Sequence, residues 1–261
     1  MATALKASTA ALAVLESALR LKKLDGTLTS ALAPLERADP SALIPTDVAA
    51  LDACLRGGLP RGQLSELAGP QSSGRTTTLL RMMAAATARG EIVALVDAFD
   101  RFDVQSAVDA GVDLSRLLWV RGQEIRGLGG EGARGQFRPS EGIERSVKAL
   151  NLILQAGGFG LVALDLGDAS SADIRRLPYT TWLRIQRAIE GSDTACVLVG
   201  SEPIGRSAGG LTLTFTGRSA WAGSSDRSRL LTGTESRVQI HSPRRKVEGA
   251  AHVRSAVALG F

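Results

Sequence analysis

The sequence predicts an α/β fold in which a mostly parallel sheet is covered by helices on both faces. From residue 64 to residue 200, short apolar runs alternate with segments of helical periodicity, as expected for parallel strands joined by crossover helices. The apolar run Leu64–Ala68 is followed by a loop with two glycines and then by a helical segment. That context is typical of a phosphate-binding loop. The 261 residues are enough for one large domain with extensions.

Composition narrows the class of protein. The formal net charge of +5 is a mild basic bias that favours a nucleic acid or another acidic partner. Cys54 and Cys196 lie far apart in apolar segments, which is typical of reduced core thiols in a cytosolic protein. With two histidines in addition, a structural zinc site is not expected. No apolar segment approaches the roughly 20 residues of a membrane helix, so we expect a cytoplasmic protein without a membrane partner.

The N-terminal region, residues 1–43, is predicted to hold one helix and a linker. Residues 3–22 show an amphipathic pattern with a narrow apolar seam, and residues 23–43 contain prolines and a mixed composition. Two interpretations of the helix stay open, because it can pack on its own domain or dock on a partner protein. The leucines of the seam are Leu5, Leu12, Leu15 and Leu19.

The core, residues 44–221, is predicted to hold most of the regular structure. Buried strands are predicted at Leu64–Ala68, Ile92–Asp97, Leu117–Val120, Leu161–Asp165 and Thr194–Val199, and a half-exposed strand at Leu211–Thr216. Helices are predicted at Thr76–Arg89, Val104–Ala110, Ile143–Gln155 and Tyr179–Ile189. Residues 122–136 contain six glycines, which indicates a flexible loop.

The C-terminal part, residues 222–261, is predicted to be a basic extension. Its cations outnumber Asp226, Glu235 and Glu248, so it is suited to DNA or to an acidic protein surface. We expect this end to be mobile, with a short strand at Arg237–Ile240. The cations are Arg227, Arg229, Arg237, Arg244, Arg245, Lys246 and Arg254.

The loop Gly69–Thr76 carries the strongest motif in the chain. Gly69 and Gly74 have the spacing G-x-x-x-x-G, which lets backbone N–H groups cradle phosphate oxygens at the start of a helix. The motif continues with lysine and then serine or threonine, whereas this chain has Arg75 and Thr76. Arginine keeps the charge but replaces a compact ammonium with a wide planar fork.

The order of these pieces resembles the RecA-like recombinase core over about residues 44–217. The resemblance implies a RecA-type ATPase sheet, with ATP or ADP and magnesium as cofactors. The stretches that carry it are Ile44–Asp52, Gly57–Gly62, Gly69–Thr76, Val96–Ala98, Leu161–Asp165, Thr194–Gly200 and Gly209–Leu213.

The chain departs from this family at three parts of the hydrolytic machinery. Arg75 stands where the family has the lysine that contacts the β- and γ-phosphates. Phe99 stands where the family has its catalytic glutamate and cannot position an attacking water; a displaced carboxylate at Asp100 or Asp97 stays open. The nucleotide-sensing glutamine is replaced around Ser201–Glu202. We therefore expect very weak or no ATPase activity and assign no catalytic residue.

The remaining site residues also follow from the resemblance. Asp165 matches the aspartate that acts on magnesium through water, and Thr76 matches the hydroxyl that ligates the metal. The expectation is a degenerate phosphate and magnesium site where nucleotide binding is weak or absent. Its residues are Gly69, Ser72, Ser73, Gly74, Arg75, Thr76, Thr77 and Asp165.

A RecA-like chain of this size with an altered nucleotide site is similar to the ImuA family, also described as SulA-like or RecA-like. Members are accessory proteins of bacterial mutagenic translesion synthesis. The resemblance implies a role in the SOS response to DNA damage, at the nucleoid in the cytoplasm. Implied partners are an ImuB-type Y-family polymerase homologue, an error-prone replicative-type polymerase and RecA. The alternatives are a DNA-dependent ATPase or recombinase paralogue with arginine in its P-loop, and a division inhibitor.

Single-stranded DNA is a further candidate ligand. The recombinase family holds DNA by loops after the third and fourth core strands, which correspond to Gly167–Pro178 and Ser201–Gly210. Tyr179 and Phe215 are the nearby candidates for base stacking, and the arginines of these loops can also be plain solvated charges. The candidate DNA- or partner-binding residues are Arg175, Arg176, Arg206, Arg227, Arg229, Arg244, Arg245 and Lys246.

Overall fold

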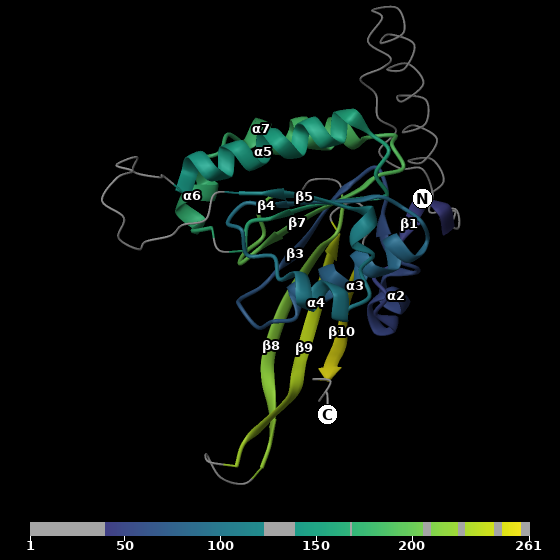
Figure 1. The fold of residues 1–261 in the computed structure, drawn as a ribbon, viewed down its shortest axis with the longest axis vertical. Coiled ribbons are helices and arrows are strands. Elements are labelled where there is room, and N and C mark those ends of the chain that lie inside the picture. The colour runs from purple at the N-terminus through teal and green to yellow at the C-terminus, as the bar shows by residue number, and fades with distance from the viewer. Residues whose placement is uncertain are drawn as a thin grey trace, which may run out of the picture. The chain divides into compact units, whose positions relative to one another are not determined.

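The computed structural model describes residues 40–122, 139–167, 169–205, 210–223, 228–242 and 247–256. These residues fall within one compact unit, Asp39–Phe261 (Figure 1). The predicted N-terminal helix lies outside the described residues, as does the predicted glycine-rich loop apart from Gly122. Among the described residues, no helix combines the length and apolar character needed to cross a membrane.

An eight-stranded sheet forms the centre of the fold. Its strands are β3 (Leu64–Ala68), β4 (Val93–Asp97), β5 (Leu117–Arg121), β6 (Leu161–Asp165), β7 (Ala195–Gly200), β8 (Thr212–Ala222), β9 (Leu230–Ser242) and β10 (Val247–Ala256). Their order is β10-β9-β8-β3-β7-β6-β4-β5. The pairs from β8 to β5 are parallel, whereas β9 and β10 are antiparallel to their neighbours. The predicted mostly parallel sheet is confirmed.

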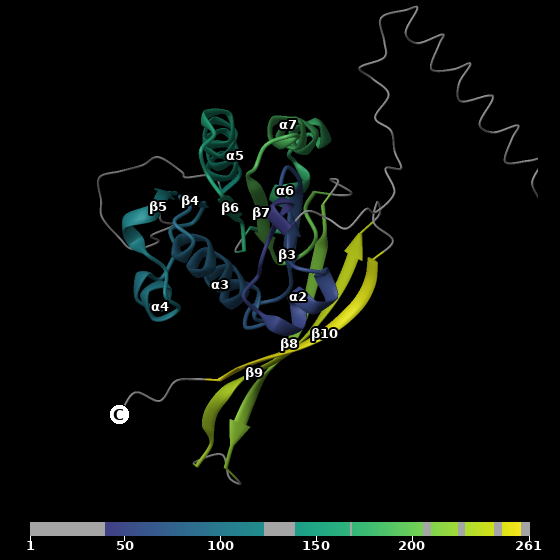
Figure 2. The same ribbon diagram turned by 90° about the vertical axis from the view of Figure 1, so that its right-hand side faces the viewer.

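Helices cover both faces of this sheet. The α-helices are α2 (Ala49–Leu55), α3 (Arg75–Ala88), α4 (Val104–Asp109), α5 (Pro139–Ala156), α6 (Ser171–Arg175) and α7 (Tyr179–Ile189). Figures 1 and 2 show α5 and α7 over one face, and α2, α3 and α4 over the other. Leu95 packs in the cluster with α3, and its neighbour Val96 packs in the cluster with α5 and α7. This alternation follows from the period of a strand and confirms the predicted two-sided covering.

A small substructure precedes β3. It consists of the 3₁₀ helix η2 (Pro40–Ala42), then β1 (Leu43–Ile44), α2 and β2 (Leu59–Pro60), with β1 and β2 paired antiparallel. Gly58 must be glycine here, because its φ is 139° and a Cβ atom would lie 2.0 Å from the carbonyl oxygen of Ile44. A second 3₁₀ helix, η3 (Leu114–Arg116), leads into β5. The stretch Gly57–Gly62, which is part of the resemblance to the RecA-like core, thus contains the second strand of a short ribbon.

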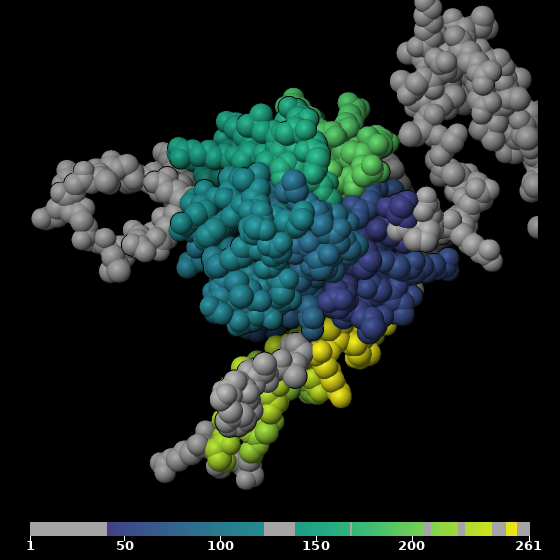
Figure 3. All heavy atoms as spheres, turned by 45° about the vertical axis from the view of Figure 1, so that its right-hand side comes forward, coloured from purple at the N-terminus to yellow at the C-terminus, as the bar shows by residue number. Residues whose placement is uncertain are grey.

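The C-terminal strands correct the expectation of a mobile end. Residues 230–242 and 247–256 form β9 and β10 in the same sheet as β3, and β8 continues six residues beyond the predicted Thr216, to Ala222. Val238 and Ala251 are buried in the core, while alternate residues of the same strands face outward. Because the outward residues are largely polar or charged, the average composition of this region did not indicate strands. Figures 1 and 3 show the far end of β8 and β9 extending beyond the helical layers.

Candidate functional site: the phosphate loop and the surfaces around it

The glycine loop joins the buried central strand β3 to α3. β3 lies between β7 and β8 and is buried along its whole length. The chain turns through Ser72, whose φ is 58°, and Gly74, whose φ is 93°, and α3 then begins at Arg75. The loop and the first turn of α3 present backbone N–H groups and the positive end of the helix dipole. The junction between the loop and α3 therefore suits an anion.

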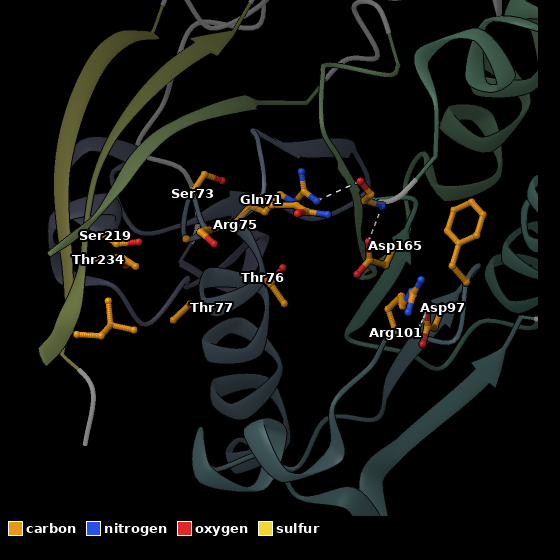
Figure 4. Close-up of a pocket in the computed structure, with 15 residues that line it drawn as sticks. Gln71, Ser73, Arg75, Thr76, Thr77, Asp97, Arg101, Asp165, Ser219 and Thr234 are labelled. Atoms are coloured by element: carbon orange, nitrogen blue, oxygen red, sulfur yellow. Dashed lines mark hydrogen bonds between the residues drawn. The ribbon is translucent and has the colours of Figure 1, made fainter. Parts of the chain in front are cut away.

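A cavity of about 330 Å³ lies against the loop (Figure 4). Its walls come from the loop and the start of α3, from the segments after β4 and β6, and from β8 and β9. Except for Gly69, all predicted phosphate and magnesium residues line it. They are Ser72, Ser73, Gly74, Arg75, Thr76, Thr77 and Asp165. The fold therefore brings these residues together, although Asp165 comes from a strand almost 90 positions away in the sequence.

Arg75 does not direct its charge at the expected phosphate position. Its side chain is buried, and its guanidinium donates hydrogen bonds to three backbone carbonyl oxygens. Nη1 donates to Gly69 and, at 3.0 Å, to Gly200, while Nη2 donates to Gly167 at 3.2 Å. These carbonyls follow or end β3, β7 and β6. Arg75 thus joins the carboxyl ends of three neighbouring strands.

Gly167 is shaped for this arrangement. A Cβ atom at this position would lie 2.6 Å from Nη2 of Arg75 and 3.0 Å from Oδ1 of Asp165. The backbone N–H of Gly167 donates to Oδ1 of Asp165 at 2.8 Å, and Figure 4 shows Arg75 and Asp165 on either side of this hydrogen-bonded turn. The backbone at Gly167 therefore helps to position both Arg75 and Asp165.

The residues present fit a phosphate group better than they fit hydrolysis. Thr76 and Thr77 are exposed at the start of α3 and line the cavity with Asp165, so hydroxyl and carboxylate oxygens suited to magnesium are present. Ser73 also lines the cavity, and its buried hydroxyl has no hydrogen-bond partner among the described residues. Those residues contain no group of three or more His, Cys, Asp or Glu side chains that could hold a metal ion.

The carboxylates in and after the end of β4 have protein partners. Phe99 is buried in the cluster with α5 and α7, although it also borders the cavity. Asp97 is buried and accepts hydrogen bonds from the backbone N–H groups of Arg101 and Phe102, at 3.0 and 2.8 Å. Asp97 therefore shapes the turn.

Asp100, the other candidate for a displaced carboxylate, is held in a salt bridge. Arg121 donates to its two oxygens from Nε and Nη2, at 2.8 and 2.7 Å. The same guanidinium lies over the ring of Trp119, 4.5 Å from its centroid. Asp100 does not line the cavity at the phosphate loop.

Sequence reasoning missed Arg101, which lines the same cavity. Its guanidinium lies on the side of the cavity that also holds Asp97 and Asp165 (Figure 4), and the residue is exposed. Asp100 has a φ of 56°, so the chain turns sharply just before Arg101. No sequence motif marks this position, because the turn and the hydrogen bonds of Asp97 decide where the side chain goes.

Strands β8 and β9 pack directly on the phosphate loop. Ser236 Oγ on β9 donates to the carbonyl oxygen of Ser73 at 2.6 Å. Gly217 on β8 allows close approach, since a Cβ atom there would lie 2.8 Å from the Cα atom of Ser73. The C-terminal strands are therefore part of the site, which the sequence did not indicate.

Glu66 fixes the segment that follows β7. Its carboxylate is buried and accepts hydrogen bonds from the backbone N–H groups of Ile204, at 3.2 Å, and Gly205. Burial raises the pKa of Glu66 above its ordinary value, and the two backbone hydrogen bonds oppose that rise only in part. This carboxylate ties the central strand to the start of the predicted DNA loop at Ser201–Gly210.

The two predicted DNA loops meet at one cavity of about 520 Å³. Arg175, at the end of α6, and Glu202 both line it, and their side chains form a loose pair at 3.9 Å. Arg176 pairs with Asp173 at 3.3 Å, and Arg206 lies outside the described residues. Tyr179 is half exposed beside the cavity. Glu202 does not border the phosphate-loop cavity, and the replacement of the sensing glutamine stays a prediction.

Phe215 is not a stacking group, which corrects the expectation for that residue. It is fully buried on β8, pairs with Val238 on β9 and packs in the core. A side chain in this position cannot reach a base without unfolding the sheet. The aromatic groups that border the loop cavity are Tyr179 and Trp182, and Trp182 is itself buried.

A set of cations lies on one face of β8, β9 and β10. The register pairs Glu235 with Arg218 on one side and Arg254 on the other, and pairs Arg237 with Thr216 and His252. Directly paired residues share a face, so we call Arg218, Arg237 and Arg254, together with the neighbouring His252, the cation face. Together with Glu235 they line a groove of about 510 Å³.

Glu235 offsets part of this charge. Arg218 and Arg254 approach its oxygens to 2.9 and 3.3 Å, and the hydrogen bond from Arg218, followed by the charges of Arg254 and Arg218, lowers its pKa. Arg229 is exposed at the start of β9. The other predicted C-terminal cations, Arg227, Arg244, Arg245 and Lys246, lie outside the described residues.

Comparisons with known proteins agree with the fold. A family model described as the RecA N-terminal domain matches residues 29–126. Protein RecA of Chlorobium chlorochromatii is 30% identical over 171 residues, which cover 60% of this chain and 43% of that protein. Protein RecA of Clavibacter michiganensis is 37% identical over 131 residues, 50% of this chain and 31% of that protein. Protein RecA of Streptomyces ambofaciens is 29% identical over 197 residues, 69% and 48% of the two chains.

The chain spans less than half the length of each of these three relatives. The matches support a RecA-like family and, with the sheet described above, a RecA-like α/β core. The predicted resemblance to this core is therefore supported. The finer resemblance to the ImuA proteins stays a prediction.

Proposed function

We propose that this RecA-like chain is an accessory protein of DNA-damage-induced, error-prone translesion synthesis, which works by binding proteins and DNA. The observation that carries the proposal is the pair of altered residues at the phosphate loop. The guanidinium of Arg75 is occupied by three backbone carbonyls, and Phe99 is a core side chain. Neither residue can act on a γ-phosphate or an attacking water, so the fold serves binding instead of turnover.

We propose that nucleotide binding is weak and separate from hydrolysis. The loop amides and Thr76 would hold the phosphates and magnesium, with Asp165 acting on the metal through water. A bound magnesium nucleotide would connect the loop, which would hold its phosphates, to Asp165 at the end of β6, which would act on the metal. Asp97 is held by backbone N–H groups and Asp100 by Arg121, so we assign neither of these two carboxylates to the activation of water at this cavity.

The proposed partners are those implied by the resemblance to the ImuA family: an ImuB-type Y-family polymerase homologue, an error-prone replicative-type polymerase and RecA. The proposed place of action is the nucleoid in the cytoplasm. Single-stranded DNA is the proposed nucleic-acid ligand. The cation face and Arg175 with Tyr179 support it, because they combine exposed cations with an exposed aromatic ring.

A second candidate function is that of a DNA-dependent ATPase or recombinase paralogue. The observation in its favour is the retained geometry of the loop, with Thr76 and Asp165 on one cavity. The likeness to RecA proteins is compatible with either function.

Phosphate release in the presence of single-stranded DNA separates the two candidates. We expect the wild-type chain to show no DNA-stimulated release with magnesium and ATP, even where calorimetric titration detects binding. Turnover at the rate of an active recombinase would refute the accessory function. Arg75→Lys combined with Phe99→Glu is the sharper variant. We expect it to stay inactive, because a carboxylate at position 99 would enter the buried cluster under α5 and α7.

A further inference from the structure

Two arginines line the cavity at the phosphate loop, and they differ in environment. Arg75, from the loop motif, is 6% exposed and donates to three backbone carbonyls. Arg101, from the turn after β4, is exposed. The motif places the phosphate-binding charge at position 75. In the fold, however, the guanidinium at this position donates to backbone carbonyls.

We propose that Arg101 is the cation that binds phosphate groups in this cavity, and that Arg75 is a structural residue. Turning Arg75 toward a phosphate would remove this donor from the buried carbonyls of Gly69 and Gly200 and from the partly buried carbonyl of Gly167. A buried polar group that loses its partner is costly. Arg75 therefore stays with the carbonyls when an anion binds.

The backbone around Arg101 is fixed in a way that suits this role. Asp97 accepts from the N–H groups of Arg101 and Phe102. Asp100 takes the left-handed conformation and is held through two hydrogen bonds from Arg121. A turn with both sides anchored holds the backbone of residue 101 at a constant position, so it is mainly the side chain that a ligand must order.

Besides Asp97 and Asp165, the cavity is lined by groups that suit a phosphate. Thr76 and Thr77 supply hydroxyl groups at the start of α3, and the loop supplies N–H groups. The buried hydroxyl of Ser73, without a hydrogen-bond partner among the described residues, is a further polar group at this wall. The guanidinium fork of Arg101 matches the paired oxygens of a phosphate. The ligand class is thus a pyrophosphate or the diphosphate of a nucleotide.

This inference goes beyond the proposed function. It concerns which residue holds a phosphate, whereas the proposed function concerns turnover and partners. If Arg101 fails the test below, the accessory function is not affected. If DNA-stimulated turnover is found, the assignment of Arg101 can still be tested by binding.

Calorimetric titration of the full chain with inorganic pyrophosphate, and separately with ADP, tests the assignment. We expect Arg101→Ala to weaken binding at least about tenfold, as for loss of one charge-assisted contact, and Arg101→Lys to restore part of it. We expect Arg75→Met to keep the affinity within about threefold while lowering the melting temperature. Arg145→Ala is the matched control, because Arg145 is an exposed arginine on α5, in a pair of 4.0 Å with Glu141.

Arg75→Lys is the second variant if Arg75→Met does not fold, and its expected affinity is also that of the wild type. The assignment is overturned if Arg101→Ala binds pyrophosphate and ADP as the wild type does. It is also overturned if Arg75→Lys weakens binding as much as Arg101→Ala, or if the wild type binds neither ligand at millimolar concentration.

Discussion

Arginine has opposite roles in two regions that lie on either side of the β8–β9 ribbon. At the phosphate loop, Arg75 is buried, and its donors meet carbonyl oxygens at the ends of β3, β6 and β7. On the cation face, Arg218, Arg237 and Arg254 are exposed, and Glu235 is the carboxylate between two of them. Residue type alone does not distinguish these environments.

Burial decides whether an arginine contributes to the stability of the fold or to the binding of a ligand. A buried guanidinium has lost its hydration and must keep all of its protein partners, so it contributes to the structure. An exposed guanidinium keeps its hydration, and its surface salt bridge is worth little. Its charge can therefore meet a phosphate without cost to the fold. Sequence reasoning assigned binding to Arg75 and to the C-terminal cations alike, whereas the guanidinium of Arg75 donates to backbone carbonyls.

The largest expected effect comes from removing the buried cation. Arg75→Met should lower the free energy of unfolding by ~3 kcal/mol, because two buried carbonyls and one partly buried carbonyl lose a charged donor. Arg237→Met on the cation face should change it by less than ~0.5 kcal/mol, as for an exposed substitution. Urea denaturation followed by circular dichroism measures both. Equal losses in the two variants would contradict the distinction between the two regions.

The next effect concerns DNA and the cation face. Arg237→Ala with Arg254→Ala should weaken binding to single-stranded DNA about tenfold and lower the salt slope of log affinity by about 1.4 units, for two lost phosphate contacts. Arg145→Ala with Arg187→Ala removes the same charge from α5 and α7 and is the control. Fluorescence anisotropy over a range of salt concentrations gives both quantities. An unchanged slope in the cation-face variant means that DNA binds elsewhere.

A smaller effect is expected where the ribbon touches the phosphate loop. Ser236→Ala removes the hydroxyl that donates to the carbonyl oxygen of Ser73, and it should cost ~1 kcal/mol of stability. Ser219→Ala, at an exposed position on β8, is the control. Thermal melts should show a lower midpoint only for Ser236→Ala, and no difference between the two variants would argue against this contact.

The smallest effect is a pH dependence at Glu66. Because burial raises its pKa above the ordinary 4.5, the folded state binds the proton more tightly than the unfolded state does. The contribution of Glu66 to stability is therefore greatest below pH 4.5 and falls as the pH rises through the raised pKa. Glu66→Gln removes the titration, so the melting temperature of the wild type relative to this variant should decrease between pH 4 and pH 7. A constant difference is incompatible with a raised pKa.

Much of the parallel core could be predicted because its signals are local. The helix Tyr179–Ile189 and the strands Leu64–Ala68 and Leu161–Asp165 have the predicted bounds. Apolar runs, helical periodicity, and proline or glycine at element ends depend on neighbouring residues. The antiparallel strands were harder to predict from the sequence. One face of β9 is solvated and carries charged residues, and such a composition is also typical of a mobile tail.

The sequence by itself determined the α/β class, the position of the phosphate loop, and the absence of lysine and glutamate at two catalytic positions. Only the tertiary structure decided the use of Arg75, whose partners Gly167 and Gly200 lie 92 and 125 positions away. It also decided that Arg101 enters the cavity and that Arg218 and Arg254 meet at Glu235. Such contacts depend on strand order, register and burial, which arise when distant segments pack together.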